Sequence, residues 1–205
     1  MQITIDKKTG ILSTVIAILL GVILFMSGSR SGVSNFFGMD HSMMHEGATS
    51  SKVSLVGSDT MFFQMMIPHH QQAVDISELA MATSKDPELI MLAKEIRDGQ
   101  AAEIVQMKKW LIDAGQTSDM GHHMGDGTGG MLTDSELATL KASTGSTFDI
   151  YWLQKMITHH EGALHMVTMI ENSPNLSIEK FGQNIVNVQS AQIKQMKEML
   201  KRLGA

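Results

Sequence analysis

Apolar side chains recur every three or four positions between residues 58 and 203, which is the period of an α-helix with one buried face. In the first such segment, Phe62, Met66 and Ala73 share a face, and Gln71 and Asp75 share the opposite one. The pattern predicts long helices over about 58–83, 86–113, 147–171 and 177–203, and a short helix between 133 and 145.

Capping residues support these boundaries. Asp86 precedes Pro87, which places a capping side chain and then a proline at the start of the second long helix. Thr133 and Glu136 form a capping box for the short helix. Pro68 lies inside the first helix on its polar face, where the carbonyl that it leaves unpaired can reach water.

The first long helix is repeated in the third. Residues 59–76 align with residues 149–166 without a gap, and the helices that follow match after a shift of one residue. Identical pairs in the first match are Asp59/Asp149, Gln64/Gln154, Met66/Met156, Ile67/Ile157, His69/His159, His70/His160 and Ala73/Ala163. Each half is therefore a helical hairpin, and two hairpins predict an all-α four-helix bundle over residues 58–205. Its hairpins span 58–114 and 132–205, joined by a Met-, His- and Gly-containing loop over 115–131.

The N-terminal residues predict export of this bundle. Residues 11–26 contain no charged side chain, and Lys7 and Lys8 precede them. A span needs about 20 apolar residues, so neighbouring Gly and Ser must extend this run. We expect residues 1–30 to form a transmembrane anchor with the bundle outside the cytoplasm. If the segment is a cleaved signal peptide, the bundle is secreted or periplasmic. Residues 31–57 form a flexible linker.

Each duplicated helix carries two adjacent histidines. His70 falls near the middle of its apolar face and His69 on the edge, and the second copy repeats this placement. Burying an imidazole is costly unless it has a partner. One interpretation gives each histidine a hydrogen bond to Glu103 or Gln192 of a neighbouring helix.

The other interpretation is a metal site that the two His-His pairs form with the matched methionines. Met66 and Met156 lie four residues before the second histidine of each pair, so they stand on the same helix face. The primary candidate ligands are Met66, His69, His70, Met156, His159 and His160, with Met65 as a secondary candidate.

Composition narrows the choice of metal. The chain has 19 Met, 9 His and no Cys, which excludes thiolate sites and disulfides. Thioether and imidazole together suit Cu(I), and Ag(I) by the same softness, whereas zinc rarely takes Met. A di-iron site needs inward Glu-x-x-His motifs, but Glu161 and His165 are four apart on the polar face. Haem between Met and His is the weaker alternative, because two His-His pairs fit one axial ligand pair poorly. The net charge of −5 argues against nucleic acid as a partner.

Two further Met/His tracts lie among glycines outside the predicted helices. Such side chains are a poor choice for an ordinary polar linker, and we interpret them as sites for low-affinity capture or transfer of metal. Their candidate ligands are His41, Met43, Met44 and His45 in the linker, and Met120, His122, His123 and Met124 in the loop.

These motifs resemble those of the bacterial domain-of-unknown-function family 305, which includes CopM-like copper-binding proteins. The resemblance rests on MIPHHQQA at 66–73, FD with MITHHEGA between 148 and 163, and the second-helix residues 100–111. It covers about residues 58–202 and implies a ferritin-like bundle, export and, for some members, copper binding and resistance. Thr158 stands where the second motif often has proline, which should leave that helix straighter.

We therefore predict an extracytoplasmic copper-binding protein for buffering, storage, delivery or resistance, with Cu(I) as its ion. A copper transporter or chaperone is the expected partner. Two alternatives stay open. One is an oxidase acting on Cu(I), which needs an open coordination position. The other is a structural or pH-sensing bundle whose histidines titrate near neutral pH.

Overall fold

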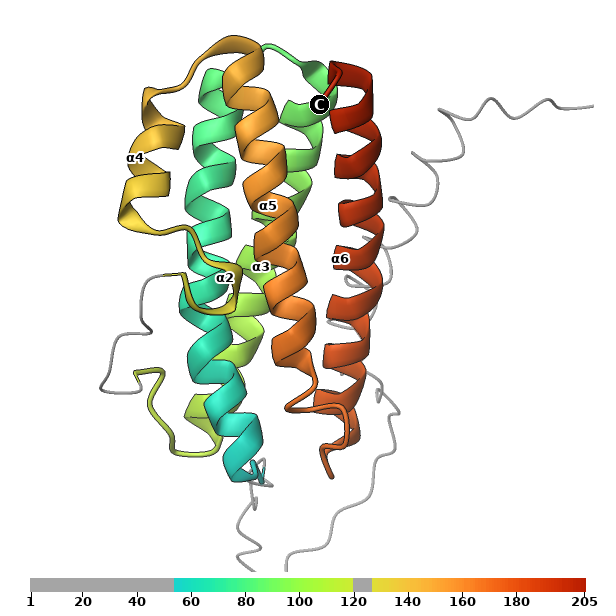
Figure 1. Ribbon diagram of the computed structural model, residues 1–205. Helices are drawn as coiled ribbons and strands as arrows, with labels where there is room; N and C mark the ends of the chain where they lie inside the picture. The colour runs from blue at the N-terminus through green and yellow to red at the C-terminus, as the bar shows by residue number, and fades with distance from the viewer. Residues whose placement is uncertain (1–53, 120–126) are drawn as a thin grey trace, which may run out of the picture. The chain divides into compact units, whose positions relative to one another are not determined.

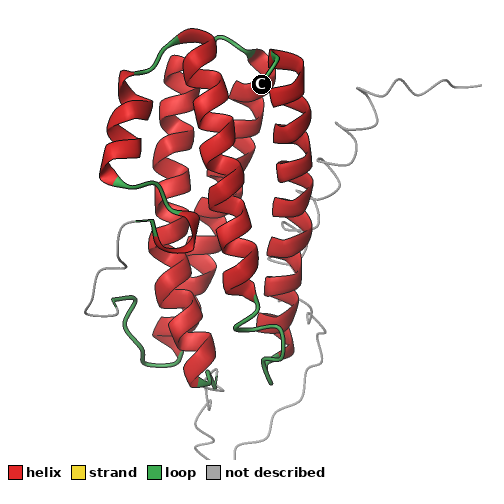
Figure 2. Cartoon of the chain, in the orientation of Figure 1, coloured by secondary structure: helices red, strands yellow, loops and turns green. Residues whose placement is uncertain are grey.

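The computed structural model describes residues 54–119 and 127–205, and within them every regular element is a helix (Figure 2). The elements are α2 (Gly57–Thr83), α3 (Pro87–Asp113), the 3₁₀ turn η1 (Thr128–Gly130), α4 (Asp134–Ala142), α5 (Gly145–Val167) and α6 (Leu176–Leu203). The predicted helices and the short capped helix are thus confirmed. The chain divides into two compact units, 1–50 and 51–205, and the described residues all belong to the second.

The predicted N-terminal anchor, with its apolar run at 11–26, lies outside the described residues, as does almost all of the predicted linker. Residues 120–126 of the predicted loop lie outside them too. Over the described ranges, none of the helices combines the length and apolar character that a membrane crossing requires.

The four long helices form a bundle in which each hairpin of the sequence is a hairpin in space (Figure 1). α2 packs most extensively on α3, and α5 packs on α6. α2 also packs against α5, which joins the two halves of the duplication. α4 lies on the outside of the bundle beside α5 (Figure 1). The duplication therefore places its two His-bearing helices next to each other.

Local sequence explains where the helices begin. The Asp86 side chain accepts hydrogen bonds from the backbone N–H groups of Glu88 and Leu89, at 2.9 and 3.3 Å, as the Asp-Pro signal predicts. The Thr133 hydroxyl accepts from the Glu136 N–H at 3.3 Å, and the Glu136 carboxylate accepts from the Thr133 N–H at 2.8 Å. Both bonds of the predicted capping box are present.

The third long helix differs from its predicted bounds of 147–171. It begins at Gly145, whose φ of +58° suits glycine, so this residue starts the helix as well as ending the preceding turn. It ends at Val167 because the next residues form tighter turns. Met169 and Ile170 donate to carbonyls three residues back, at 3.1 and 3.0 Å.

The core consists of two hydrophobic clusters, one toward each end of the bundle. Leu89, Ile96, Trp152 and Met156 belong to one cluster, together with Met196. The other contains Phe62, Met66, Ile104, Met166 and Ile185. Buried polar residues lie between the members of the two clusters on each long helix, except that Val74 of the second cluster follows the histidines on α2. These polar residues are His69 and His70 on α2, Gln100 on α3, His159 and His160 on α5, and Gln189 on α6. We call these six residues the central polar layer.

Candidate metal centre

The four histidines of the central polar layer are fully buried, with no exposed surface. The His69 and His159 rings meet where α2 packs on α5, with ring centroids 3.7 Å apart and planes tilted by 35°. Within each pair the rings stand farther apart, at 6.1 Å for His69 and His70 and 6.4 Å for His159 and His160. The predicted juxtaposition of the two His-His pairs is therefore present in the fold.

Three of these rings have one hydrogen-bond partner each. His69 Nε2 lies 2.9 Å from the carbonyl oxygen of Gly129, in η1. His70 Nε2 lies 2.7 Å from Glu103 Oε2 on α3. His160 Nε2 lies 2.9 Å from Gln192 Oε1 on α6. The partners Glu103 and Gln192 that the helix pattern indicates are thus confirmed.

The chemistry of these partners assigns the protons on the rings. A carbonyl or carboxylate oxygen only accepts, so Nε2 of His69 and of His70 carries a hydrogen, and in the neutral form of each ring the lone pair is then on Nδ1. The Nδ1 atoms of His69, His70 and His160 are buried without a hydrogen-bond partner, and both ring nitrogens of His159 are as well. A buried polar atom without a partner is costly, which points to a ligand that these nitrogens would hold.

Burial also keeps the rings of His69, His159 and His160 neutral. Desolvation, reinforced by the neighbouring His70, lowers the pKa of His69 from 6.5 to about 3. Desolvation lowers the pKa of His160 from 6.5 to about 4, although the hydrogen bond to Gln192 raises it. Desolvation and then His69 hold the pKa of His159 well below 6.5. Neutral imidazole is the form that binds a metal ion, so the fold prepares these ligands at neutral pH.

His69 and His159, which the helix pattern places at the edges of their apolar faces, are nevertheless fully buried. The reason is the segment around η1, which packs against α5 and brings Gly129 onto His69. A Cβ on Gly162 would lie 1.6 Å from the Gly129 oxygen, so only glycine in α5 permits this approach. Gln72, at the matching position of α2, exchanges two hydrogen bonds with the Leu132 backbone, at 2.9 and 2.7 Å. The loop is therefore fixed to both His-bearing helices.

The methionines divide between the two sides of the polar layer. Met66 and Met156 are both fully buried, but they belong to different hydrophobic clusters. The fold thus brings the imidazoles together and leaves these two thioethers apart. Met65 is half-buried against the same cluster as Met66.

The helix pattern did not single out Met166, whose thioether borders the loop over His69. A Cβ on Gly129 would lie 3.4 Å from Met166 Sδ and 3.7 Å from His69 Cδ2. The sequence does contain one sign that a backbone segment approaches α5 here. Gly162 lies in the middle of that helix, one turn before Met166, and a glycine at such a position often permits close packing.

Gln100 and Gln189 complete the polar layer from α3 and α6. Their side chains are buried, and neither the amide oxygen nor the amide nitrogen of either has a hydrogen-bond partner. The two residues occupy matching positions in the duplication. They add buried amide donors and acceptors without partners to the polar layer.

Within the described ranges, no three His, Asp or Glu side chains are arranged to hold a metal ion. His165 lies on the exposed face of α5, as the pattern predicts. The candidate tracts at 41–45 and 120–124 lie outside the described residues.

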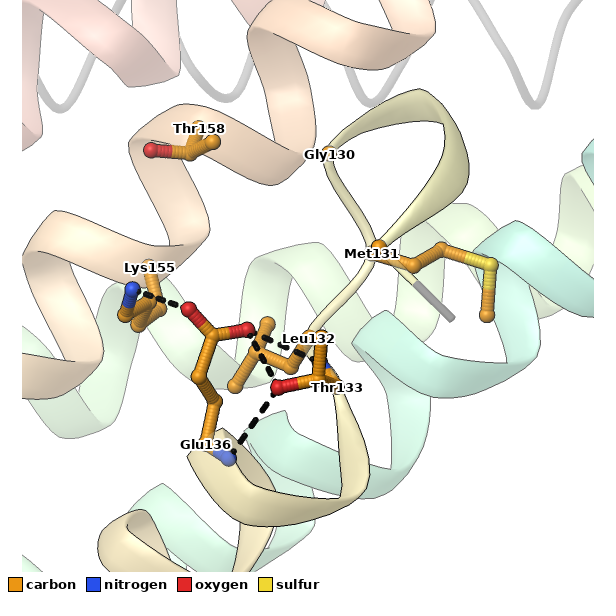
Figure 3. Close-up of a pocket in the computed structure, with 8 residues that line it drawn as sticks. Gly130, Met131, Leu132, Thr133, Glu136, Lys155 and Thr158 are labelled. Atoms are coloured by element: carbon orange, nitrogen blue, oxygen red, sulfur yellow. Dashed lines mark hydrogen bonds and ion pairs between the residues drawn. The ribbon is translucent and has the colours of Figure 1, made fainter. Parts of the chain in front are cut away.

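A surface pocket of about 210 Å³ lies beside the loop, between α4 and α5 (Figure 3). Glu136 and Lys155 point toward each other across it and form an ion pair at 2.5 Å. That pairing lowers the pKa of Glu136 from 4.5 to about 2. This ion pair joins α4 to α5.

The fold and this layer define a class: helical-bundle proteins with a duplicated His-His motif on two adjoining helices. The chain belongs to the family described as domain of unknown function DUF305, which matches residues 59–200. No match was found among curated proteins.

Solved structures of this family share the fold. A Streptomyces coelicolor DUF305 protein described as secreted is 29% identical, with a TM-score of 0.66 over 72% of this chain and 94% of that one. CopM in its Cu(I)-bound form is 32% identical, with a TM-score of 0.60 over 70% of this chain and 96% of that one. CopM in its Cu(II)-bound form is 34% identical, with a TM-score of 0.63 over the same shares. CopM also matches in an Ag-bound form.

Proposed function

We propose that this protein is an extracytoplasmic copper-binding protein whose central polar layer holds Cu(I), and Ag(I) as a substitute. The observation that carries the proposal is a set of buried imidazole nitrogens without partners, at His69, His70, His159 and His160. The lowered pKa values of His69 and His159 keep these rings neutral, and His70 Nε2 is bonded to Glu103. The remaining ring nitrogens can therefore offer lone pairs to an ion at the centre of the bundle. A monovalent soft ion is the ligand class that such nitrogens fit.

The nearby thioethers support a soft ion. Met66 stands one turn from His69 and His70 on α2, and Met156 stands likewise on α5. Because no three imidazole or carboxylate groups of the described residues converge, an ion in this layer would take at most two of them and fill its shell with sulfur. Low coordination by sulfur and nitrogen suits Cu(I) and Ag(I). The similarity to CopM, solved with Cu(I), Cu(II) and Ag, supports the same choice.

The role that we propose is buffering, storage, delivery or resistance, with a copper transporter or chaperone as partner. The tracts at 41–45 and 120–124 would capture ions at low affinity and pass them to the bundle. The apolar segment at 11–26 would anchor or export the domain, and the secreted relative supports an extracytoplasmic location.

The pH-sensing alternative loses support from the buried rings. A sensor at neutral pH needs an imidazole that titrates near 7. The pKa of His69 is about 3 and that of His160 about 4. Copper binding therefore remains the function that the site supports best.

The test is an anaerobic Cu(I) titration of the full-length chain against a competing chelator. A variant with His70→Ala and His160→Ala should lose the tight site, while His165→Ala, on the exposed face of α5, should keep it. Deleting 41–45 and 120–124 should lower the number of bound ions and leave the tight site intact. Unchanged affinity in the His70/His160 double variant would refute the proposed function.

A further inference from the structure

The duplication gives its two central histidines unequal partners. Glu103 and Gln192 occupy matching positions of α3 and α6, and each binds Nε2 of the buried histidine in its own hairpin, at 2.7 and 2.9 Å. His70 and His160 are equally buried, and Nδ1 of each has no partner. The hydrogen-bond partners of His70 and His160 therefore differ in one group, a carboxylate against an amide.

The first consequence concerns the ring tautomer. The Glu103 carboxylate accepts from His70 Nε2–H, which fixes the lone pair on Nδ1, inside the layer. An amide can rotate to present either its oxygen or its N–H₂ group, so Gln192 does not fix the tautomer of His160 in the same way. A histidine whose outer nitrogen donates to a carboxylate is also the more basic metal ligand.

The second consequence concerns charge. A Cu(I) ion among neutral imidazoles and thioethers brings one uncompensated positive charge into a buried layer, which is unfavourable. Glu103, with only 15% of its side chain exposed, supplies a carboxylate directly behind His70. Gln192 supplies no charge behind His160. An ion on the His70 side is therefore compensated, and a second ion on the His160 side is not.

We propose that Glu103 is a positioning residue that makes the duplicated centre hold one Cu(I) ion tightly, on the His70 side. The His160 side, backed by Gln192, binds a second ion only weakly. The inference rests on the proposed copper function and adds to it the number of tight ions and the residue that sets this number.

The experiment compares three full-length chains: wild type, Glu103→Gln and Gln192→Glu. These changes keep the size of the side chain and an oxygen that accepts from the imidazole. The Met/His tracts are identical in all three, so differences report on the centre. In the Cu(I) competition titration, Glu103→Gln should lower the affinity for the tightly bound ion about tenfold. Gln192→Glu should add a second tight ion.

Two further readouts separate positioning from a structural role. The ¹⁵N spectrum of the His70 ring should show a single Nε2–H tautomer in the metal-free wild type and a mixture in Glu103→Gln. The midpoint potential of bound copper should rise in Glu103→Gln, because losing a negative charge disfavours Cu(II) more than Cu(I). Thermal unfolding of each metal-free variant checks that the bundle is intact.

The outcomes separate the two hypotheses. If both variants bind the same number of ions with wild-type affinity, the role of Glu103 is wrong and the copper function stands. If wild type binds Cu(I) no more tightly than the His70/His160 double variant, the copper function is wrong and this inference falls with it.

Discussion

The imidazole rings of His69 and His159 lie against each other at the centre of the bundle, with centroids 3.7 Å apart and planes tilted by 35°, and His159 has no hydrogen-bond partner on either nitrogen. This contact joins the two copies of the duplicated helix. It also places an unsatisfied polar group at a position where an apolar side chain would pack at lower cost.

The first prediction concerns that cost. Replacing His159 by Leu removes two buried polar atoms without partners and fills a similar volume. The metal-free variant should be more stable than wild type by about 1 kcal/mol in urea unfolding. The same variant should bind Cu(I) more weakly, because a ligand is lost. A variant that is both less stable and equally good at binding would contradict a metal role for His159.

The second prediction is an acid sensitivity of the metal-free protein. Between pH 6.5 and about 4 the unfolded chain binds more protons than the folded one, because the pKa values of His69, His159 and His160 are lowered by folding. Stability should therefore be complete above pH 6.5 and fall as the pH drops through this window. Glu136, with a pKa of about 2, loses its contribution only below its unfolded value of 4.5. Urea unfolding at pH 7, 6 and 5 in the presence of a chelator measures the slope, which the His159→Leu variant should reduce. If the free energy of unfolding of the wild type were the same at pH 7, 6 and 5, the predicted acid sensitivity would be refuted.

The third prediction tests the loop over His69. In Gly162→Ala the new Cβ would meet the Gly129 oxygen at 1.6 Å, so the loop must move and the hydrogen bond to His69 must lengthen. We expect a loss of about 2 kcal/mol in stability. Gly99→Ala is the matched control, because nothing lies within 4 Å of its added Cβ in the interior of α3. It should gain about 0.5–1 kcal/mol from helix propensity. Equal effects of the two substitutions would show that the loop is not held in this way.

The fourth prediction concerns the thioethers. Met66 and Met156 are buried in separate clusters, so Leu at both positions conserves volume and should cost less than about 1.5 kcal/mol per site. Cu(I) affinity should fall with much less change in stability, since Leu offers no sulfur. The control is Met199→Leu, a buried methionine outside the polar layer, which should bind normally. Normal Cu(I) binding by the Met66/Met156 variant would remove both from the ligand set.

Much of the fold followed from the sequence because helix period, capping and duplication act locally. Asp86-Pro87 and the Thr133–Glu136 box mark helix starts with side chains that bond their own backbone. The end of α5 at Val167 was missed, because the turns that follow carry no proline or glycine signal until Pro174.

The site was predicted less completely than the fold. A helix face gives the direction of His70 and its partner Glu103, but it does not reveal a loop that folds over the face. His69 is buried by Gly129, which is 60 residues away in the sequence. The separation of Met66 from Met156 likewise depends on how α2 packs against α5 where the His69 and His159 rings meet. The period of apolar residues along a single helix does not predict this packing.

The central claim is that the Nδ1 atoms of the buried histidines bind a soft ion. The most direct measurement is the imidazole ¹⁵N spectrum of the full-length chain during titration with Ag(I), a soft ion without redox chemistry. We predict that the Nδ1 resonances of His69 and His70 shift as the tight site fills, while their Nε2–H signals persist, and that the Nδ1 resonance of His160 shifts only as a second, weaker ion binds. Nδ1 resonances of these rings that stay unchanged when the chain is saturated with Ag(I) would contradict the claim.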